Sequence, residues 1–256
     1  MRYFYLLLFL IMFYSCKDKT TEPVLSTHDY IGWVIISDST CDPIKNYSGV
    51  KVTVIQTGAV SYSDSAGHYK FTNLSTGNYD FLYEYKDYPQ FYLQNIALSG
   101  INGSVIKAKD LDEISPKATH TFILDSAVYG SAYSTNSSQT DTTLNLYSRR
   151  FNSFPIRYSN HIDIISKSQS NLDYLSGKYD KILGWSSSSL AYKTTDSLWE
   201  TFSYDSLKHW GFKSGDSICI KYYAVNSISY YIDKTTGKRI YPYIGSESNV
   251  YATKLK

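Results

Sequence analysis

VKVTVIQTGAVSYSDSAGHYKFTNLSTGNYDFLYEY, residues 50–85, decides the fold class of this chain. Apolar or aromatic residues occupy every second position of its first and last segments and would share one face of a strand (Val50, Val52 and Val54; Tyr79, Phe81, Tyr83 and Tyr85). Between them, DSAG (64–67) and NLSTGN (73–78) have the composition of tight turns, with Gly67 and Gly77 supplying the backbone freedom for the reversals. Short alternating strands joined by tight turns predict an antiparallel sheet.

Similar strand signals continue on both sides of this stretch. In the first half they fall at 29–36, 91–98 and 121–124. In the second half they fall at 143–147, 161–166, 181–185, 198–202, 217–226, 228–232, 238–244 and 250–255, with a turn region at 207–215. No apolar pattern of helical period exceeds two turns. We therefore predict an all-β protein of two antiparallel β-sandwich domains, at 29–125 and 126–256, the second beginning with a Ser/Thr-rich linker.

Four segments of the first half carry a family resemblance: GWV at 32–34, GVKVTV at 49–54, SDSAGHYKF at 63–71 and NLSTGNYDF at 73–81. In this order they resemble the carboxypeptidase regulatory-like domain, although Ser63 stands where the family usually has Thr. The resemblance implies a transthyretin-like, carbohydrate-binding-like sandwich that is not catalytic. Residues 185–255 resemble a fibronectin type III-like sandwich, with Ile218 at the position of the family's corner tyrosine.

The composition narrows the function classes. The 43% hydrophobic fraction excludes a disordered chain, and 19% charged residues is too few for a coiled coil. The chain has 25 basic and 23 acidic residues, and this net charge of +2 argues against a nucleic-acid partner. The 27 tyrosines suit half-buried pleated surfaces.

The N-terminus, MRYFYLLLFLIMFYSC, is typical of an export signal. One Arg precedes an apolar run that is too short to span a bilayer as a helix, and Ser15 precedes Cys16. This ending resembles a lipobox, which implies a signal peptide at 1–15, lipidation (palmitate) of Cys16, a tether at 16–28 and anchoring in the outer membrane. A plain secretory signal is the alternative. Lys17 and Asp18 resemble a surface-export signal, which leaves the cell surface and the periplasmic face both open.

Chemistry-bearing motifs are sparse. The five histidines are single, with no His or Cys three to five residues away, so the spacing predicts no metal site. No G-x-S-x-G, P-loop, G-x-G-x-x-G or H-E-x-x-H occurs, and we predict neither a catalytic residue nor a cofactor. Asp110 and Asp112 are expected to be solvent charges in a loop. Cys41 and Cys219 are either two thiols or a bridge.

Two residue sets point to surface contacts. Most aromatic residues are expected in the core, with Tyr88, Trp210 and Tyr243 as candidate exposed contacts. Asp-Ser/Thr triplets that resemble a bacterial O-glycosylation motif nominate seven hydroxyls, with turn capping as the alternative reading (Ser39, Ser65, Ser126, Thr142, Ser197, Ser206 and Ser217).

These observations predict a non-catalytic cell-envelope lipoprotein that acts as a surface binding or adhesion module for carbohydrate or protein. The alternative is a structural spacer, or an accessory subunit that positions a partner at the outer membrane. An enzyme with an unrecognised site is a third reading.

Overall fold

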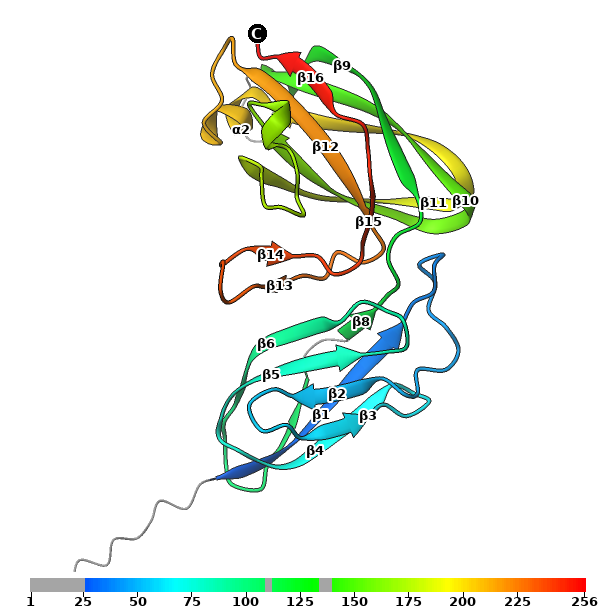
Figure 1. Cartoon of the computed structure of the whole chain (residues 1–256), viewed down its shortest axis with the longest axis vertical. Helices are drawn as coiled ribbons and strands as arrows, with labels where there is room; N and C mark the ends of the chain where they lie inside the picture. Colours follow the sequence, from blue (N-terminus) through cyan, green and yellow to red (C-terminus); the bar gives the residue numbers. More distant parts are fainter. Residues whose placement is uncertain (1–25, 109–111, 134–139) are drawn as a thin grey trace, which may run out of the picture.

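The structure is a computed structural model that describes residues 26–108, 112–133 and 140–256, without the side chains of 131–133, 140–141, 152–159 and 184–196. It confirms the all-β prediction (Figure 1). Its strands form two units that lie end to end along the long axis, with one short hairpin between them.

The first unit is a sandwich of two four-stranded sheets. One sheet contains β1 (Thr27–Ile36), β4 (His68–Ser75), β7 (Val105–Lys107) and β8 (Asp112–Ile114), with β7 and β8 both parallel to β1. The other has the order β3 (Val60–Tyr62), β2 (Lys51–Val54), β5 (Gly77–Glu84) and β6 (Phe91–Leu98), all antiparallel.

The alternation seen in the sequence builds the core between these sheets. The inward valines of β2 and the inward rings of β5 are buried, as predicted (Val52 and Val54; Tyr79, Phe81 and Tyr83). Gly67 has a φ of 87°, as its turn requires, but Gly77 has no positive φ and lies within β5. The reversal between β4 and β5 therefore does not depend on glycine at position 77.

The second unit is one six-stranded sheet that folds over on itself. It consists of β9 (Thr121–Tyr133), β10 (Thr140–Ser166), β11 (Lys181–Ser203), β12 (Ser217–Val225), β15 (Ile244–Glu247) and β16 (Tyr251–Lys254). The register of β10 against β11 shifts between Phe151 and Tyr158. β9 pairs with the part of β10 before these shifts, and β12 pairs with the part after them. Side chains from both parts share one core.

Several predicted boundaries differ from the structure. The strands expected at 143–147 and 161–166 are one strand, β10, and those expected at 181–185 and 198–202 are one strand, β11. β9 runs through the expected domain boundary and through part of the expected linker, so the division between the units falls between Ile114 and Thr121. Antiparallel pairing of β9 with β10, from Tyr133 opposite Thr140 to Thr121 opposite Phe151, supplies backbone hydrogen bonds along this polar stretch and explains the difference.

The turn region expected at 207–215 overlaps a short helix, α2 (Tyr204–His209), which follows β11 directly. A separate 3₁₀ turn occupies Gln169–Asn171, between β10 and β11. The Ser203 hydroxyl accepts the Ser206 N–H at 3.1 Å and caps α2. Leu207, the buried residue of α2, packs into the second core, so this short helix closes one end of that core.

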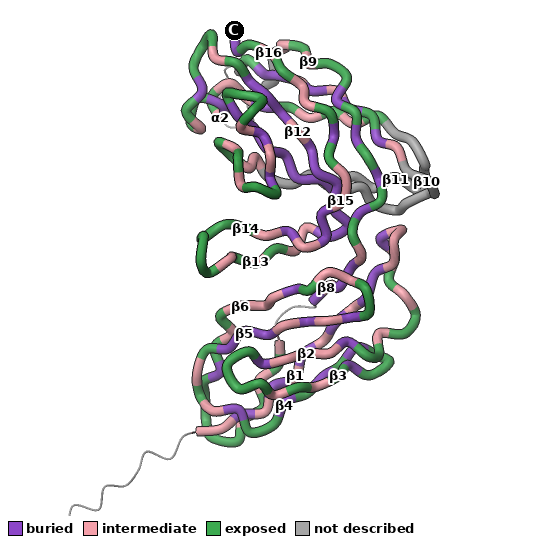
Figure 2. The backbone as a smooth tube through the Cα atoms, viewed as in Figure 1, coloured by how far each residue is buried: buried purple, intermediate pink, exposed green. Residues whose placement is uncertain are grey.

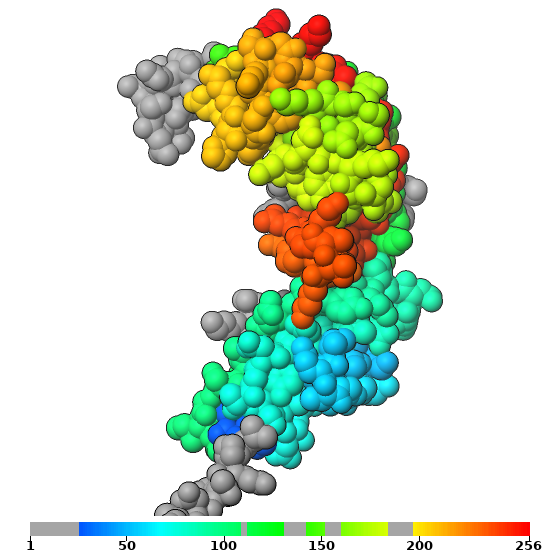
Figure 3. Space-filling model, turned by 60° about the vertical axis from the view of Figure 1, so that its left-hand side comes forward, coloured from blue at the N-terminus to red at the C-terminus, as the bar shows by residue number. Residues whose placement is uncertain are grey.

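The β13 (Tyr231–Ile232) and β14 (Arg239–Ile240) hairpin projects from the second unit onto the first, and Figure 3 shows it in orange at the waist of the molecule. The Gln94 side-chain oxygen accepts the Ile232 N–H at 3.0 Å, and Lys234 pairs with Asp80. The segment after the hairpin enters the first core, as described below. The two units are thus fastened by side chains as well as by the chain between them.

Figure 2 shows how burial is distributed: β12 is buried along most of its length, whereas the tip of the β13–β14 hairpin is exposed. Cys41 and Cys219 are buried, unbridged thiols, which resolves the alternative that the sequence left open. Within the described residues, no helix is long and apolar enough to span a membrane.

Candidate functional site

The three aromatic residues nominated as exposed contacts are not a surface cluster. Tyr243 is completely buried, which makes that prediction wrong. Its ring stacks on Phe91 with centroids 6.4 Å apart, and its hydroxyl donates to the Glu113 carbonyl at 2.8 Å. Tyr88 and Trp210 are half-buried and pack against the first and second cores respectively.

The seven hydroxyls nominated for glycosylation lie outside both cores. Ser39 and Ser206 are half-buried and the other five are exposed (Ser65, Ser126, Thr142, Ser197 and Ser217). Turn capping operates at two of the motifs: Asp38 accepts the Thr40 N–H at 2.8 Å, and Asp64 accepts the Ala66 N–H at 2.9 Å. Glycosylation at any of the seven stays a prediction, and Cys16 lies outside the described residues.

Asp112 is not the solvent charge that its sequence context suggested. It lies in β8, is buried, and accepts the Tyr83 hydroxyl at 2.6 Å, with the Tyr69 hydroxyl 3.5 Å away. Parallel pairing of β8 with β1 carries it into the sandwich. Asp110 lies outside the described residues.

The most exposed tryptophan that the structure describes is Trp199, with 60% of its surface accessible. It is directly opposite Tyr147 in the β10–β11 register, and the two ring centroids are 4.5 Å apart. In the next pair of the same face, Asn145 lies opposite Thr201. We call these four residues the ring platform.

Hydrogen bonds fix the orientation of the Trp199 ring. Its indole N–H lies 3.1 Å from the Thr201 hydroxyl oxygen and 3.3 Å from the Asn145 side-chain oxygen. The Thr201 hydroxyl in turn donates to Asn145 at 2.9 Å. A ring held in this way loses little conformational entropy when a ligand covers it.

Neighbouring side chains extend the platform along the same face. Val128 of β9 lies opposite Asn145 and is exposed. Arg149, two residues after Tyr147, forms two hydrogen bonds with Asp125, at 2.6 and 2.7 Å. The surface therefore combines aromatic rings, an amide, hydroxyl groups and a planar ion pair.

Sequence reasoning missed this site although β11 carries its signal. In LWETF (198–202), Leu198 and Phe202 lie on the face of the strand that packs against the core, whereas Trp199 and Thr201 lie on the face exposed to solvent. A Trp in the solvent-facing phase of an alternating strand, with a second aromatic ring directly opposite it, marks a candidate contact surface. The same alternation places the charged Glu200 on the face of β11 that points into the protein.

A second surface candidate is a groove of about 320 Å³ beneath the β13–β14 hairpin. Tyr92 of β6 and Tyr231 of β13 form its aromatic part, with ring centroids 4.9 Å apart. Asp80 and Lys234, which line the groove, already satisfy one another. The groove is therefore mainly a contact between the two units.

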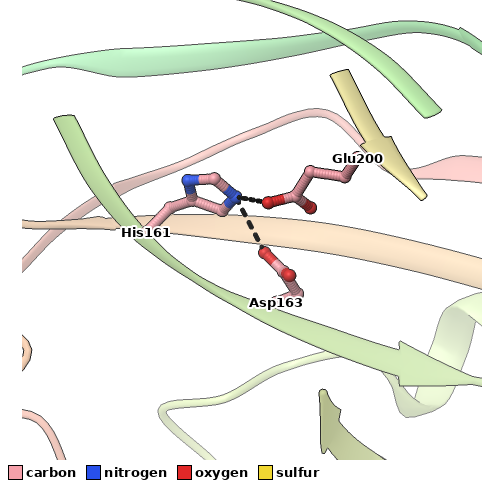
Figure 4. Close-up of side chains that lie close together, drawn as sticks. All are labelled: His161, Asp163 and Glu200. Atoms are coloured by element: carbon pink, nitrogen blue, oxygen red, sulfur yellow. Dashed lines mark hydrogen bonds and ion pairs between the residues drawn. The ribbon is translucent and has the colours of Figure 1, made fainter. Parts of the chain in front are cut away.

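Glu200 belongs to a buried charge cluster inside the second unit (Figure 4). His161 Nε2 lies 2.8 Å from Glu200 Oε1 and 3.1 Å from Asp163 Oδ1. The Tyr222 hydroxyl donates to the other Glu200 oxygen at 2.5 Å, and its ring stacks on the His161 ring with centroids 4.3 Å apart. The side chains of His161 and Asp163 are only 2% and 6% exposed.

The cluster shifts the pKa of each member. Burial alone would lower the pKa of His161, but the two carboxylates outweigh it and raise that pKa. Burial raises the pKa of Asp163 against the opposing effect of His161. Burial acts in the same direction on Glu200, but the hydrogen bond and charge of His161, helped by Tyr222, lower its pKa overall.

Comparisons with known proteins do not assign a family. No known family matches the chain, and no curated protein is similar in sequence. A candidate carbohydrate-binding protein from Bacteroides uniformis superposes with a TM-score of 0.29 at 10% identity, covering 90% of this chain and 100% of that one. A DUF3823 family protein from Parabacteroides merdae gives 0.26 at 11% identity, covering 78% and 91%.

A chain from a type II cohesin–X-dockerin complex of Acetivibrio cellulolyticus gives a TM-score of 0.28 at 16% identity. That match covers 34% of this chain and spans 56% of the length of the other. At TM-scores below 0.5 and such low identities, none of these similarities transfers a function to this chain.

Proposed function

We propose that this chain is a non-catalytic carbohydrate-binding module of the cell envelope and that the ring platform is its contact surface. The observation that carries the proposal is the exposed, hydrogen-bonded ring of Trp199 beside Tyr147. Leaving a large apolar ring in water is unfavourable, so a rigid, exposed Trp is a feature to be explained by what covers it.

The chemistry of the platform suits a sugar better than a protein helix or an apolar ligand. A pyranose has an apolar face that lies against an aromatic ring, and hydroxyl groups at its edge that need polar partners. Trp199 and Tyr147 supply the rings, while Thr201 and Arg149 supply polar groups at the edge. A single folded sheet holds them all in place, so the surface is formed before the ligand arrives.

A glycan array probed with the soluble chain that begins after Cys16 tests this proposal. We expect binding to a group of related glycans, and we expect it to disappear when Trp199 is replaced by Ala. Binding to no glycan on a broad array, together with capture of one specific protein, would favour a protein ligand for the same platform.

Anchoring through Cys16 is the second part of the proposal, supported by the lipobox-like ending of the N-terminal segment. Two or more acyl chains hold a protein stably in a bilayer. Cys16→Ser should therefore move the protein from the outer-membrane fraction to the soluble fraction, or leave the precursor uncut. A variant that still fractionates with the outer membrane would contradict lipidation at this residue.

A structural spacer is the competing function, and the fastening of the two units favours it. Tyr243 of the second unit fills the core of the first, and Ser227 donates to Glu113 at 2.9 Å. Such contacts suit a stiff rod that holds a partner at a fixed distance. A spacer would tolerate Trp199→Ala without loss of function, whereas a binding module would not.

A further inference from the structure

The buried charge cluster joins the two folded-over parts of the second sheet. His161 and Asp163 come from the last part of β10, and Glu200 comes from the end of β11 that pairs with the first part of β10. One imidazole nitrogen and two carboxylate oxygens thus converge, all within 4.8 Å of one another (Figure 4). A hydrophobic core gains little from such a group unless its charges are fully compensated.

We propose that His161, Asp163 and Glu200 form a site for one divalent transition-metal ion of the zinc class. The proposal is independent of carbohydrate binding at the ring platform. Nothing in the spacing of histidines and cysteines indicated it, because the third ligand comes from a distant strand that the fold of the sheet brings into contact.

The distances fit such an ion. With metal–ligand bonds of about 2.1 Å, neighbouring ligand atoms lie about 3.0 Å apart in an octahedral site and about 3.4 Å apart in a tetrahedral one. The separations from His161 Nε2 to the two carboxylate oxygens are 2.8 and 3.1 Å. Displacements of a few tenths of an ångström would bring both of these separations into that range, and the two carboxylate oxygens lie within 4.8 Å of one another.

The ligand types select the class of ion. A neutral imidazole with two carboxylates gives a divalent ion a net charge of zero, which suits a buried site. Imidazole nitrogen favours zinc and its neighbours in the first transition row. Calcium takes six to eight oxygen ligands, and magnesium prefers an octahedron of oxygens, so neither fits one nitrogen and two oxygens as well.

The surroundings of the ligands provide an independent observation. Asp163 is nearly completely buried, and its Oδ1 points at the centre of the cluster, where its neighbour is His161 Nε2 at 3.1 Å. Among the described residues this oxygen accepts no hydrogen bond of normal geometry. A metal ion would give it a direct bond in place of this strained ion pair.

Tyr222 provides the outer-shell support expected of a metal site. Its hydroxyl binds Glu200 Oε2, which leaves Oε1 directed at His161. Its ring and that of Phe122 contact the imidazole and fix its plane. Such second partners orient ligands and raise affinity. Among the described residues, His161 Nδ1 has no hydrogen-bond partner.

The test is metal uptake during folding, since the cluster is closed in the folded chain. The whole purified protein is unfolded with a chelator, refolded with Zn²⁺ or Co²⁺, and desalted. We expect about one ion retained per chain, a visible Co²⁺ spectrum of mixed nitrogen and oxygen ligation, and a rise of several degrees in the melting temperature with Zn²⁺.

Glu200→Gln and His161→Gln keep the size of the side chains and should abolish retention, whereas His68→Gln, at the exposed Asp64–His68 pair, should retain the ion like the parent. The measurement on the parent does not depend on these variants folding. No ion on the refolded parent, or equal retention by the parent and a folded Glu200→Gln variant, would overturn the proposal.

Discussion

His120 is a neutral imidazole enclosed by the second core. Its Nε2–H donates to the Asn160 carbonyl at 3.0 Å, and Phe122 packs against its ring. Burial, partly offset by this hydrogen bond, lowers the pKa of His120 to about 4. In the unfolded chain the His120 imidazole has its ordinary pKa of about 6.5, so it takes up a proton more readily than in the folded chain.

The sign of the pH effect follows from that difference. The stabilisation by neutral His120 is fully present above pH 6.5 and is lost as the pH falls from 6.5 toward 4. We expect His120→Gln to flatten the acid side of the stability curve by up to about 3 kcal/mol, measured by urea unfolding at several pH values. The exposed His209→Gln is the control, and an unchanged pH dependence in His120→Gln would contradict the assignment.

At the residue scale, fewer features of the candidate sites than of the fold could be predicted from the sequence. The alternation of LWETF places Trp199 outside and Glu200 inside, and both could have been predicted from it. The burial of Tyr243 could not, because the surface that covers it belongs to the other unit. The contact of His161 with Glu200 could not have been predicted either. It depends on how the sheet folds over at the register shifts between β10 and β11, and no local sequence pattern indicates those shifts.

At the scale of single elements, the turn between β3 and β4 depends on one glycine. Gly67 has a φ of 87°, and a Cβ on it would lie 2.0 Å from the Val34 carbonyl oxygen. Gly77 has an ordinary φ, and the nearest atom to its Cβ would be 3.7 Å away on Tyr79. We expect Gly67→Ala to destabilise the protein by at least about 2 kcal/mol, and Gly77→Ala by about 1 kcal/mol or less.

Chemical denaturation of the two alanine variants checks this prediction, with the parent as reference. Equal losses would mean that the turn at 64–67 can adopt another conformation. A larger loss at Gly77 would contradict the turn geometry described here.

Most strands of the first sandwich were predicted well because they carry their own alternation of buried and less buried residues, as β1 and β2 do. β7 and β8 were missed because three residues are too short to show a period. The lengths of β10 and β11 were missed because each is extended by the hydrogen bonds of the other, through stretches where its own pattern is weak.

At the scale of the whole molecule, the two units are energetically coupled through Tyr243. It is buried in the first core and stacked on Phe91. In the sequence, however, it follows most of the strands of the second unit. Tyr243→Ala should cost roughly 3–5 kcal/mol and expose apolar surface on the first unit, detectable with a hydrophobic dye during thermal unfolding. The exposed Tyr230→Ala is the matched control, and similar small losses in both variants would mean that the units are independent.

The central claim, that the ring platform binds carbohydrate, is tested most directly by calorimetric titration of the best glycan from the array. Trp199→Ala is compared with Tyr62→Ala, because Tyr62 is equally exposed, at 62%, but lies on β3 of the other unit. We predict that Trp199→Ala weakens binding at least about tenfold, while Tyr62→Ala leaves it unchanged. Parent-like affinity in a folded Trp199→Ala variant would contradict the account.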